Sequence, residues 1–153
     1  MKNILEEIAA RTRERIAKEK SRISVSELEN RIQEVNKNAR QKITFLQALQ
    51  KDGMSYICEV KKASPSKGLI APDFPYLAIA KEYEQAGASA ISCLTEPFYF
   101  QGADQYLKEI AAAVQIPVLR KDFTVDEYMI YQAKSLGASA VLFICAILDD
   151  GEL

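Results

Sequence analysis

One glutamate and two lysines stand where strand-like segments run into loops, and such groups could carry acid–base chemistry. Glu59 and Lys61 belong to the apolar run 56–61, and Lys121 ends a second run, 117–121. Side chains two apart in a strand share a face, so Glu59 and Lys61 point to the same side of their strand. Carboxylates and amines can exchange protons with a substrate or bind its charged groups. A structural ion pair at a sheet edge is the alternative for Glu59 and Lys61.

The absence of histidine excludes several other kinds of site. Without it, Ser-His-Asp and Cys-His catalysis are impossible, and a zinc site is not expected. The three cysteines, an odd and widely spaced set, each lie in an apolar strand-like run. We expect buried thiols in a reducing, cytoplasmic compartment and neither disulfides nor metal ligands. They are Cys58, Cys93 and Cys145.

The composition is that of an ordinary soluble domain. The 153 residues are 48% hydrophobic and 27% charged, with a net charge of −1. This balance predicts neither a nucleic-acid partner nor a membrane partner. No apolar run would span a bilayer, and Glu6 and Glu7 stand where a signal peptide would be apolar, so no targeting segment is expected.

Strand-like and helix-like segments alternate from residue 54 onward. The tetrapeptide Gly-Ala-Ser-Ala occurs at 87–90 and at 137–140, each time between a helix and an apolar strand. One strand plus one helix is therefore the repeated unit, which predicts parallel strands with right-handed crossovers. The predicted strands are 56–61, 90–94, 117–121 and 140–145. The first predicted helix has its N-cap at Asp73 and Pro75 in its first turn, and it ends at Gln85. The second runs from Ala103 to Val114. The third is capped by Asp126 and ends before Gly137.

The shared position of the three charged residues favours a functional site. In folds of parallel strands and crossover helices, function lies at the carboxyl ends of the strands. Glu59, Lys61 and Lys121 all stand at such ends, and Leu119, Lys121 and Phe123 share a face by parity. We therefore expect the three charged side chains to converge at one end of the sheet. The polar turn after Lys61 is part of the same end.

The first 53 residues are predicted to form a helical extension that covers the repeated part, residues 54–153. Apolar residues recur at helical spacing up to about Lys20. Capping-box patterns begin at Ser24 and Thr44, which predicts a second helix and a short third one that Gly53 stops. A partner-binding arm is the alternative role for this extension.

Four strand–helix units are half of an eight-unit barrel, a fold that takes about 250 residues. Asp149 and Glu152 form a further capping-box pattern, so another helix is predicted to begin at the end of the sequence. We therefore expect an α/β chain that contains about the first four units of a (β/α)8 TIM barrel. An open flavodoxin-like domain is the alternative, but it would need a Gly-rich phosphate loop where Ser64, Pro65 and Ser66 stand.

Three segments together resemble the indole-3-glycerol phosphate synthase family, (β/α)8 enzymes of tryptophan biosynthesis. They are 59–66 (EVKKASPS), 94–96 with 99–102 (LTE and YFQG), and 119–123 (LRKDF). The helical extension fits as well, because the family has an N-terminal extension that closes over the barrel. The resemblance extends over the whole of this sequence. It corresponds to only about the first half of a family member. Family members can carry a lysine where Ala63 stands, so that position is not expected to be an essential cation.

The resemblance implies a reaction and a role for each site residue. The family closes the indole ring of 1-(2-carboxyphenylamino)-1-deoxyribulose 5-phosphate with loss of carbon dioxide and water. This chemistry needs an acid, a base, and cations for the carboxylate and phosphate. Lys121 would be the general acid, Glu59 would orient a substrate hydroxyl, and Lys61 would meet a substrate anion. No cofactor and no metal are implied. The substrate-binding residues would be Ser64 and Pro65 in the first loop and an apolar wall of Phe100, Phe123, Leu142 and Ile144.

Three alternatives stay open at this stage. The four apolar residues could be plain barrel core. The chain could belong to another phosphate-sugar barrel enzyme, although the Glu59–Lys61 pair and the Ser-Pro-Ser turn speak against that. It could also be a non-catalytic half-barrel, because the family's second carboxylate, asparagine and phosphate cup lie on strands five to eight. A half-barrel leaves two strand edges unpaired, so we expect self-association.

Overall fold

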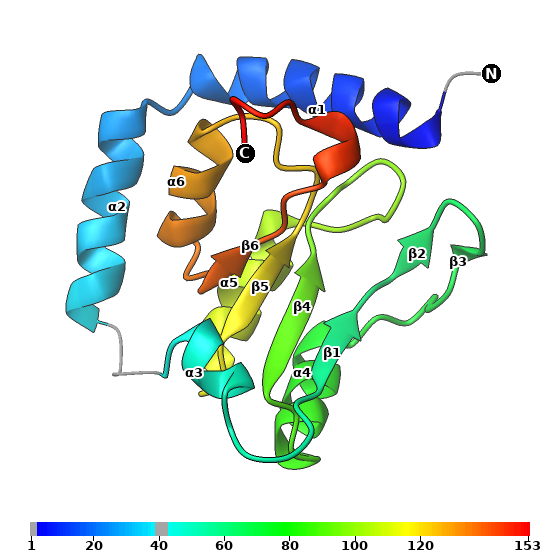
Figure 1. The fold of residues 1–153 in the computed structure, drawn as a ribbon, viewed down its shortest axis with the longest axis vertical. Helices are drawn as coiled ribbons and strands as arrows, with labels where there is room; N and C mark the ends of the chain where they lie inside the picture. Colours follow the sequence, from blue (N-terminus) through cyan, green and yellow to red (C-terminus); the bar gives the residue numbers. More distant parts are fainter. Residues whose placement is uncertain (1–2, 39–42) are drawn as a thin grey trace.

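Four parallel strands form the central sheet of the computed structural model, which describes residues 3–38 and 43–153. The strands follow one another in chain order, and their carboxyl ends point toward the top of Figure 1. This arrangement confirms the predicted alternation and the α/β class. The strands are β1 (Ile57–Val60), β4 (Ala90–Leu94), β5 (Val118–Lys121) and β6 (Ala140–Val141), and the crossover helices are α4 (Tyr76–Gln85), α5 (Asp104–Ala113) and α6 (Tyr128–Ser135).

The two Gly-Ala-Ser-Ala copies have the same local geometry. Gly87 and Gly137 adopt φ angles of +92° and +89°, values that suit glycine at the end of a helix. The next residue donates its N–H to a carbonyl five residues back. The amide of the following serine donates at 2.8 Å, from Ser89 to the Tyr56 carbonyl just before β1 and from Ser139 to the Val118 carbonyl of β5. The repeat is therefore a helix stop that also fixes where the following strand joins the sheet.

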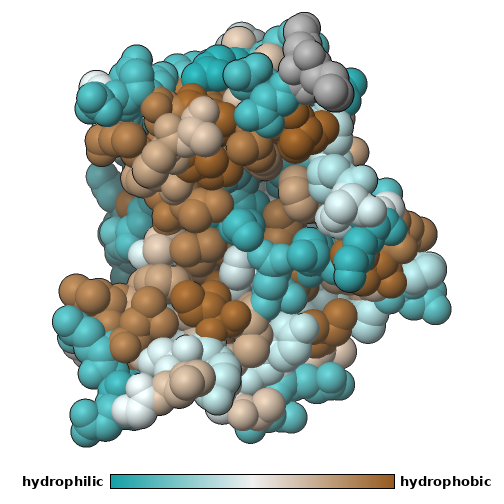
Figure 2. Space-filling view, turned by 45° about the vertical axis from the view of Figure 1, so that its right-hand side comes forward, coloured by the Kyte–Doolittle hydropathy of each residue, from teal (hydrophilic) through white to brown (hydrophobic). Residues whose placement is uncertain are grey.

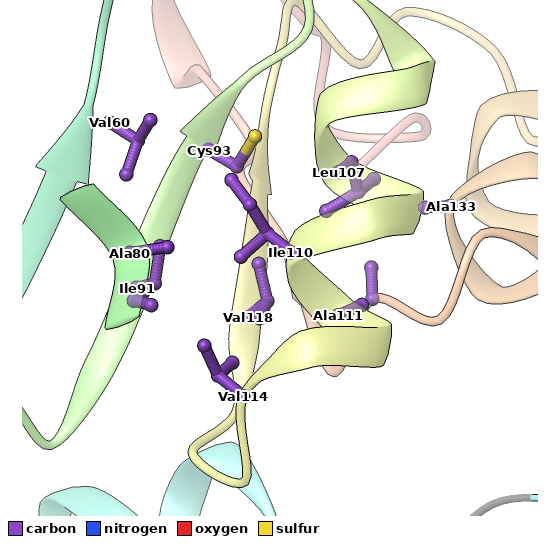
Figure 3. Packing of buried hydrophobic residues seen from close by; sticks show 11 residues of the cluster. Val60, Ala80, Ile91, Cys93, Leu107, Ile110, Ala111, Val114, Val118 and Ala133 are labelled. Atoms are coloured by element: carbon purple, nitrogen blue, oxygen red, sulfur yellow. The ribbon is translucent and has the colours of Figure 1, made fainter. Parts of the chain in front are cut away.

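One face of the sheet packs against α4 and α5 and forms the main core. The residues of this face alternate along the strands with the charged residues of the opposite face, as parity predicts. Burial raises the pKa of the Cys93 thiol to about 12, so this cysteine stays protonated. Figure 3 shows the side chains of this core, which include Val60, Ala80, Ile91, Cys93, Leu107, Ile110, Val114 and Val118.

The N-terminal helices are α1 (Ile4–Lys20), α2 (Val25–Asn38) and α3 (Phe45–Leu49). Helix α1 lies across the carboxyl ends of the strands, at the top of Figure 1, and α2 runs beside α6. A second apolar cluster joins α1 and α2 to α6, with members such as Ile16, Leu28 and Met129. The extension predicted for residues 1–53 includes positions 1–2 and 39–42, which lie outside the described residues.

The predicted capping box forms in full at Thr44, and Ser24 forms the first of the two bonds of its own box. The Thr44 side chain accepts from the Gln47 amide at 3.1 Å, and the Gln47 side chain accepts from the Thr44 amide at 2.9 Å. At the start of α2, the Ser24 side chain accepts from the Glu27 amide at 3.1 Å. Helix α3 ends at Leu49, before the predicted stop at Gly53.

Three details of the prediction were wrong, and one element was not predicted. Pro75, and not Asp73, is the N-cap of α4, which begins at Tyr76 without a side-chain cap. The turn after β1 contains a two-stranded antiparallel hairpin, β2 (Ala63–Ser64) and β3 (Gly68–Leu69). The fourth strand ends at Val141 instead of residue 145, because its register with β5 covers only two residue pairs. Cys145 consequently lies exposed in a short 3₁₀ helix, Cys145–Ile147.

No helix within the described ranges combines the length and the apolar character that crossing a lipid bilayer requires. The capping-box pattern near the C-terminus does form. The Asp149 carboxylate accepts from the amide of Glu152 at 3.0 Å, and the Glu152 carboxylate accepts from that of Asp149 at the same distance. This closes a single turn after the 3₁₀ helix.

Candidate active site

Glu59 bridges the two lysines at the carboxyl ends of the strands. Its Oε1 accepts a hydrogen bond from Lys61 Nζ at 2.7 Å, and its Oε2 accepts one from Lys121 Nζ at 2.8 Å. The predicted convergence of the three charges is therefore confirmed. Between 28% and 35% of each side chain is exposed, so the cluster can be reached from solvent. We call Glu59, Lys61 and Lys121 the charged triad.

Strand register brings the triad together. Glu59 lies opposite Ser92 in the pairing of β1 with β4, and Leu94 lies opposite Lys121 in the pairing of β4 with β5. Lys121 thus reaches Glu59 across β4, from the same face of the sheet. This reach suits a long lysine side chain, whose amine stands several bonds from the backbone.

The two ammonium groups keep Glu59 ionised. Partial burial alone would raise the pKa of Glu59, but the hydrogen bonds from Lys121 and Lys61, with the attraction of their charges, outweigh it and lower that pKa below its ordinary value. At neutral pH the site therefore presents one carboxylate between two cations. Such a site can orient a hydroxyl group, bind an anion, and donate a proton from an ammonium group.

The hairpin that follows β1 carries the two predicted loop residues. The Ser64 hydroxyl accepts a hydrogen bond from the Lys67 amide at 3.2 Å, which closes the turn. Pro65 is exposed in this turn. The base of the hairpin is held by the Lys62 carbonyl, which accepts from the amides of Ile70 and Ala71 at 2.8 and 3.1 Å. Ser64 and Pro65 therefore project from an ordered element next to the triad in sequence.

The predicted apolar wall falls into two pairs. The rings of Phe100 and Phe123 lie with their centroids 6.4 Å apart, and both residues follow strand ends. Leu142 and Ile144 come after the end of β6 and are half-buried. The structure thus brings the two phenylalanines together, while a substrate-binding role for any of the four stays a prediction.

Asp122, which follows Lys121, is a buried junction that sequence reasoning did not single out. Both oxygens of its carboxylate accept hydrogen bonds from one terminal nitrogen of Arg15 in α1, at 3.0 and 2.9 Å. It also accepts from the Thr95 hydroxyl at 2.7 Å and from the Phe123 amide at 2.8 Å. One carboxylate therefore ties the N-terminal helix and the end of β4 to the residue beside Lys121.

Arg120, which precedes Lys121, is also buried, with 1% of its surface exposed. Its Nε donates to the Thr95 hydroxyl at 3.0 Å, and one terminal nitrogen donates to the Gln132 side chain at 2.8 Å and to the Met129 carbonyl at 3.2 Å. The other terminal nitrogen forms ion pairs with Asp104 at 2.9 Å and with Asp122 at 3.4 Å. This network fixes the strand from which Lys121 extends.

Parity could have indicated these two residues. Arg120 and Asp122 alternate with Lys121, so they face the helices, where an unpartnered charge would be costly. Their burial and partners depend on α1, α5 and α6, and no local pattern predicts those contacts.

A hollow of about 650 Å³ lies away from the triad, between α6 and the C-terminal segment. Its lining combines apolar residues with the exposed Lys20–Asp126 ion pair of 2.6 Å. No member of the triad lines this hollow, so it is separate from the candidate site.

Comparison with known proteins gives a consistent result. The family model for indole-3-glycerol phosphate synthase matches residues 5–153. The indole-3-glycerol phosphate synthase of Ruminiclostridium cellulolyticum is 52% identical over 151 residues, which cover 98% of this chain and 57% of that protein. The one of Lacticaseibacillus paracasei is 53% identical over 150 residues, with the same coverage, and that of Neisseria gonorrhoeae is 59% identical over 97 residues. The chain thus spans somewhat more than half the length of the first two relatives.

Proposed function

Because this chain belongs to the indole-3-glycerol phosphate synthase family, we propose that it supplies acid–base groups for the synthesis of indole-3-glycerol phosphate. The reaction is the ring closure of 1-(2-carboxyphenylamino)-1-deoxyribulose 5-phosphate, with decarboxylation and dehydration. The observation that carries this proposal is the bridging of Lys61 and Lys121 by Glu59. The substrate is a phosphorylated small molecule with a carboxylate, a ketone and hydroxyl groups. The triad offers ammonium groups for an anion and for a proton transfer, and a carboxylate for a hydroxyl group.

Each member of the triad has a separate role in this proposal. Lys121 donates a proton to the substrate ketone as the aromatic carbon attacks it, which makes it the general acid. Lys61 binds a substrate anion, and Glu59 accepts a hydrogen bond from a substrate hydroxyl while it holds both amines in place. Ser64 and Pro65 shape the loop around the aromatic end of the substrate.

The apolar wall of the proposed site would contact the aromatic ring. Phe100 and Phe123 support this role by their mutual packing, and Leu142 and Ile144 are proposed to extend it. The proposal needs no cofactor, metal, nucleic acid or membrane, and it places the protein in the cytoplasm. It also divides the chain into an extension, residues 1–53, and a barrel part, residues 54–153.

We also propose that this chain by itself associates with further copies. Within the described residues, β1 and β6 each pair with one neighbouring strand only, so each keeps an open edge. Large apolar side chains near these edges are exposed, among them Tyr56 at 58%, Ile57 at 47% and Phe143 at 41%. Figure 2 shows hydrophobic side chains in a band that runs from below α1 to the lower left of that face.

The test of catalysis uses the chain joined to the C-terminal remainder of the Ruminiclostridium relative. Replacing Lys121 by alanine should lower kcat by about 10²–10⁴-fold with little change in KM, because a general acid acts in the transition state. Lys81→Ala, at an exposed position of α4, is the matched control. An unchanged kcat would remove Lys121 from the mechanism, and a joined protein that folds but makes no product would contradict the proposed function.

A further inference from the structure

Glu96 is fully buried at the start of the loop between β4 and α5, and the proposed reaction does not use it. Its carboxylate accepts hydrogen bonds from three backbone amides of that loop. Oε1 accepts from Phe98 at 3.0 Å, and Oε2 accepts from Tyr99 at 2.7 Å and from Phe100 at 3.0 Å. A buried carboxylate is stable only when such donors replace the water it has lost. The loop therefore wraps around this one side chain.

The far end of the same loop is fixed by contact with the β4 backbone. The Gly102 amide donates to the Glu96 carbonyl at 2.8 Å. A β-carbon at Gly102 would lie 2.5 Å from the Leu94 carbonyl oxygen, so only glycine fits there without a shift. Gln101, just before it, adopts a left-handed φ of +50°. Segment 97–102 is thus held at both ends.

Helix α1 holds the outer side of this loop. The Arg11 guanidinium lies 4.8 Å from the centre of the Phe98 ring and 5.6 Å from that of Tyr99. The Tyr99 hydroxyl donates to the Glu7 carboxylate at 2.5 Å. Phe100 therefore has little freedom: its amide is bound to Glu96, α1 holds Tyr99 just before it, and Gly102 is fixed two residues after it.

We propose that Glu96 is a positioning residue that holds Phe100 as a preformed wall for the aromatic part of the substrate. The Phe100 amide is one of the three donors to Glu96, and its ring packs against Phe123, two residues after Lys121. The role toward substrate rests on the function proposed above; the role toward the loop does not. The substrate ring then meets a fixed surface, and no ordering of the loop is needed on binding.

Hydrogen exchange of the chain tests the loop directly. Glutamine keeps the shape of Glu96 but replaces one acceptor oxygen by an NH₂ donor, so at least one loop amide faces another donor. In Glu96→Gln we expect the peptide that contains residues 97–102 to exchange about tenfold faster, the effect of losing one hydrogen bond of ordinary strength. The exchange of peptides from β4 and β5 should change much less. The control Glu82→Gln, at an exposed site on α4, should alter exchange neither in 97–102 nor in β4 and β5. Unchanged exchange in 97–102, or an equal rise in β4 and β5, would overturn the proposal.

Kinetics of the joined protein test the link to Phe100. Glu96→Gln and Phe100→Ala should each raise KM by about tenfold, as loss of apolar contact with a substrate does, and leave kcat within about twofold. In the double variant, Glu96→Gln should add little to the effect of Phe100→Ala, because Glu96 acts through Phe100. Independent, additive effects would refute that link. If the unaltered joined protein made no product, the proposed function would fail, and the exchange experiment would still decide the role of Glu96 in the loop.

Discussion

Replacing Arg120 by methionine should destabilise the chain strongly, although Arg120 is not expected to touch substrate. Methionine keeps an unbranched apolar stem and removes the guanidinium with its N–H groups. Those groups serve the Thr95 hydroxyl, the Met129 carbonyl and the side chains of Gln132, Asp104 and Asp122. Each partner then has to find another donor or stay unsatisfied in a buried place.

The partners differ in how well they can compensate, and this sets the magnitude. Asp122 keeps its hydrogen bonds from Arg15, Thr95 and the Phe123 amide, and the Asp104 side chain is 36% exposed, so water can reach it. Gln132 is buried and loses the partner of its oxygen. Removing one partner of a buried ion pair typically costs about 3–5 kcal/mol, and the surviving contacts of Asp122 place this case near about 3 kcal/mol. For a chain of this size the melting temperature should fall by roughly 6–12 °C.

Urea unfolding followed by circular dichroism measures this loss. Arg11→Met is the control, since the Arg11 side chain is exposed and its cation–π contacts are worth about 0.5–1 kcal/mol. A loss below about 1 kcal/mol in Arg120→Met would show that solvent or rearrangement replaces the network. A gain in stability would show that apolar packing serves this position better than the buried charges do.

Three further predictions concern the loop, the triad and the state of association. Gly102→Ala should cost about 1–3 kcal/mol in urea unfolding, because the new methyl group would overlap the Leu94 carbonyl, and an unchanged midpoint would mean that the loop yields. Because the pKa of Glu59 is lowered below 4.5 in the fold, its contribution to stability is present above about pH 4.5 and is lost as the pH falls through the lowered value. The stability gap between the unaltered chain and Glu59→Gln should therefore shrink with acidification, and a constant gap would contradict the ion-pair account. Sedimentation velocity of the chain alone should show dimers or larger species that grow with concentration, whereas a compact monomer throughout would refute self-association.

Local patterns in the sequence predicted the elements that local interactions define. The Thr44 capping box, the two Gly-Ala-Ser-Ala stops and the alternation along β5 each follow from neighbours a few residues apart. The convergence of Glu59 with Lys121 was also predictable, because parallel strands place their carboxyl ends together.

Features that depend on distant partners were not predictable in the same way. The hydrogen bonds between Arg15 and Asp122 join residues 107 positions apart, and nothing near either residue indicates the other. The last strand ends at Val141, although residues 142–145 are as apolar as those before them, because a strand needs a paired neighbour and not only suitable residue types. Glu96 looked like part of a recognised motif, but its role became visible only when three loop amides were found around it.

The placement of α1 has a consequence for synthesis on the ribosome. This helix is made before the sheet, yet its side-chain partners, which include Tyr99, Asp122, Asp126 and Gln132, come 92 to 113 residues later. At elongation rates of about 5–20 residues per second, α1 waits several seconds or more before its docking surface has emerged. During that time the apolar face of the helix, with Ile8 and Ile16, has no native cover. Late docking of the first helix would then complete the folding of the part that carries the triad.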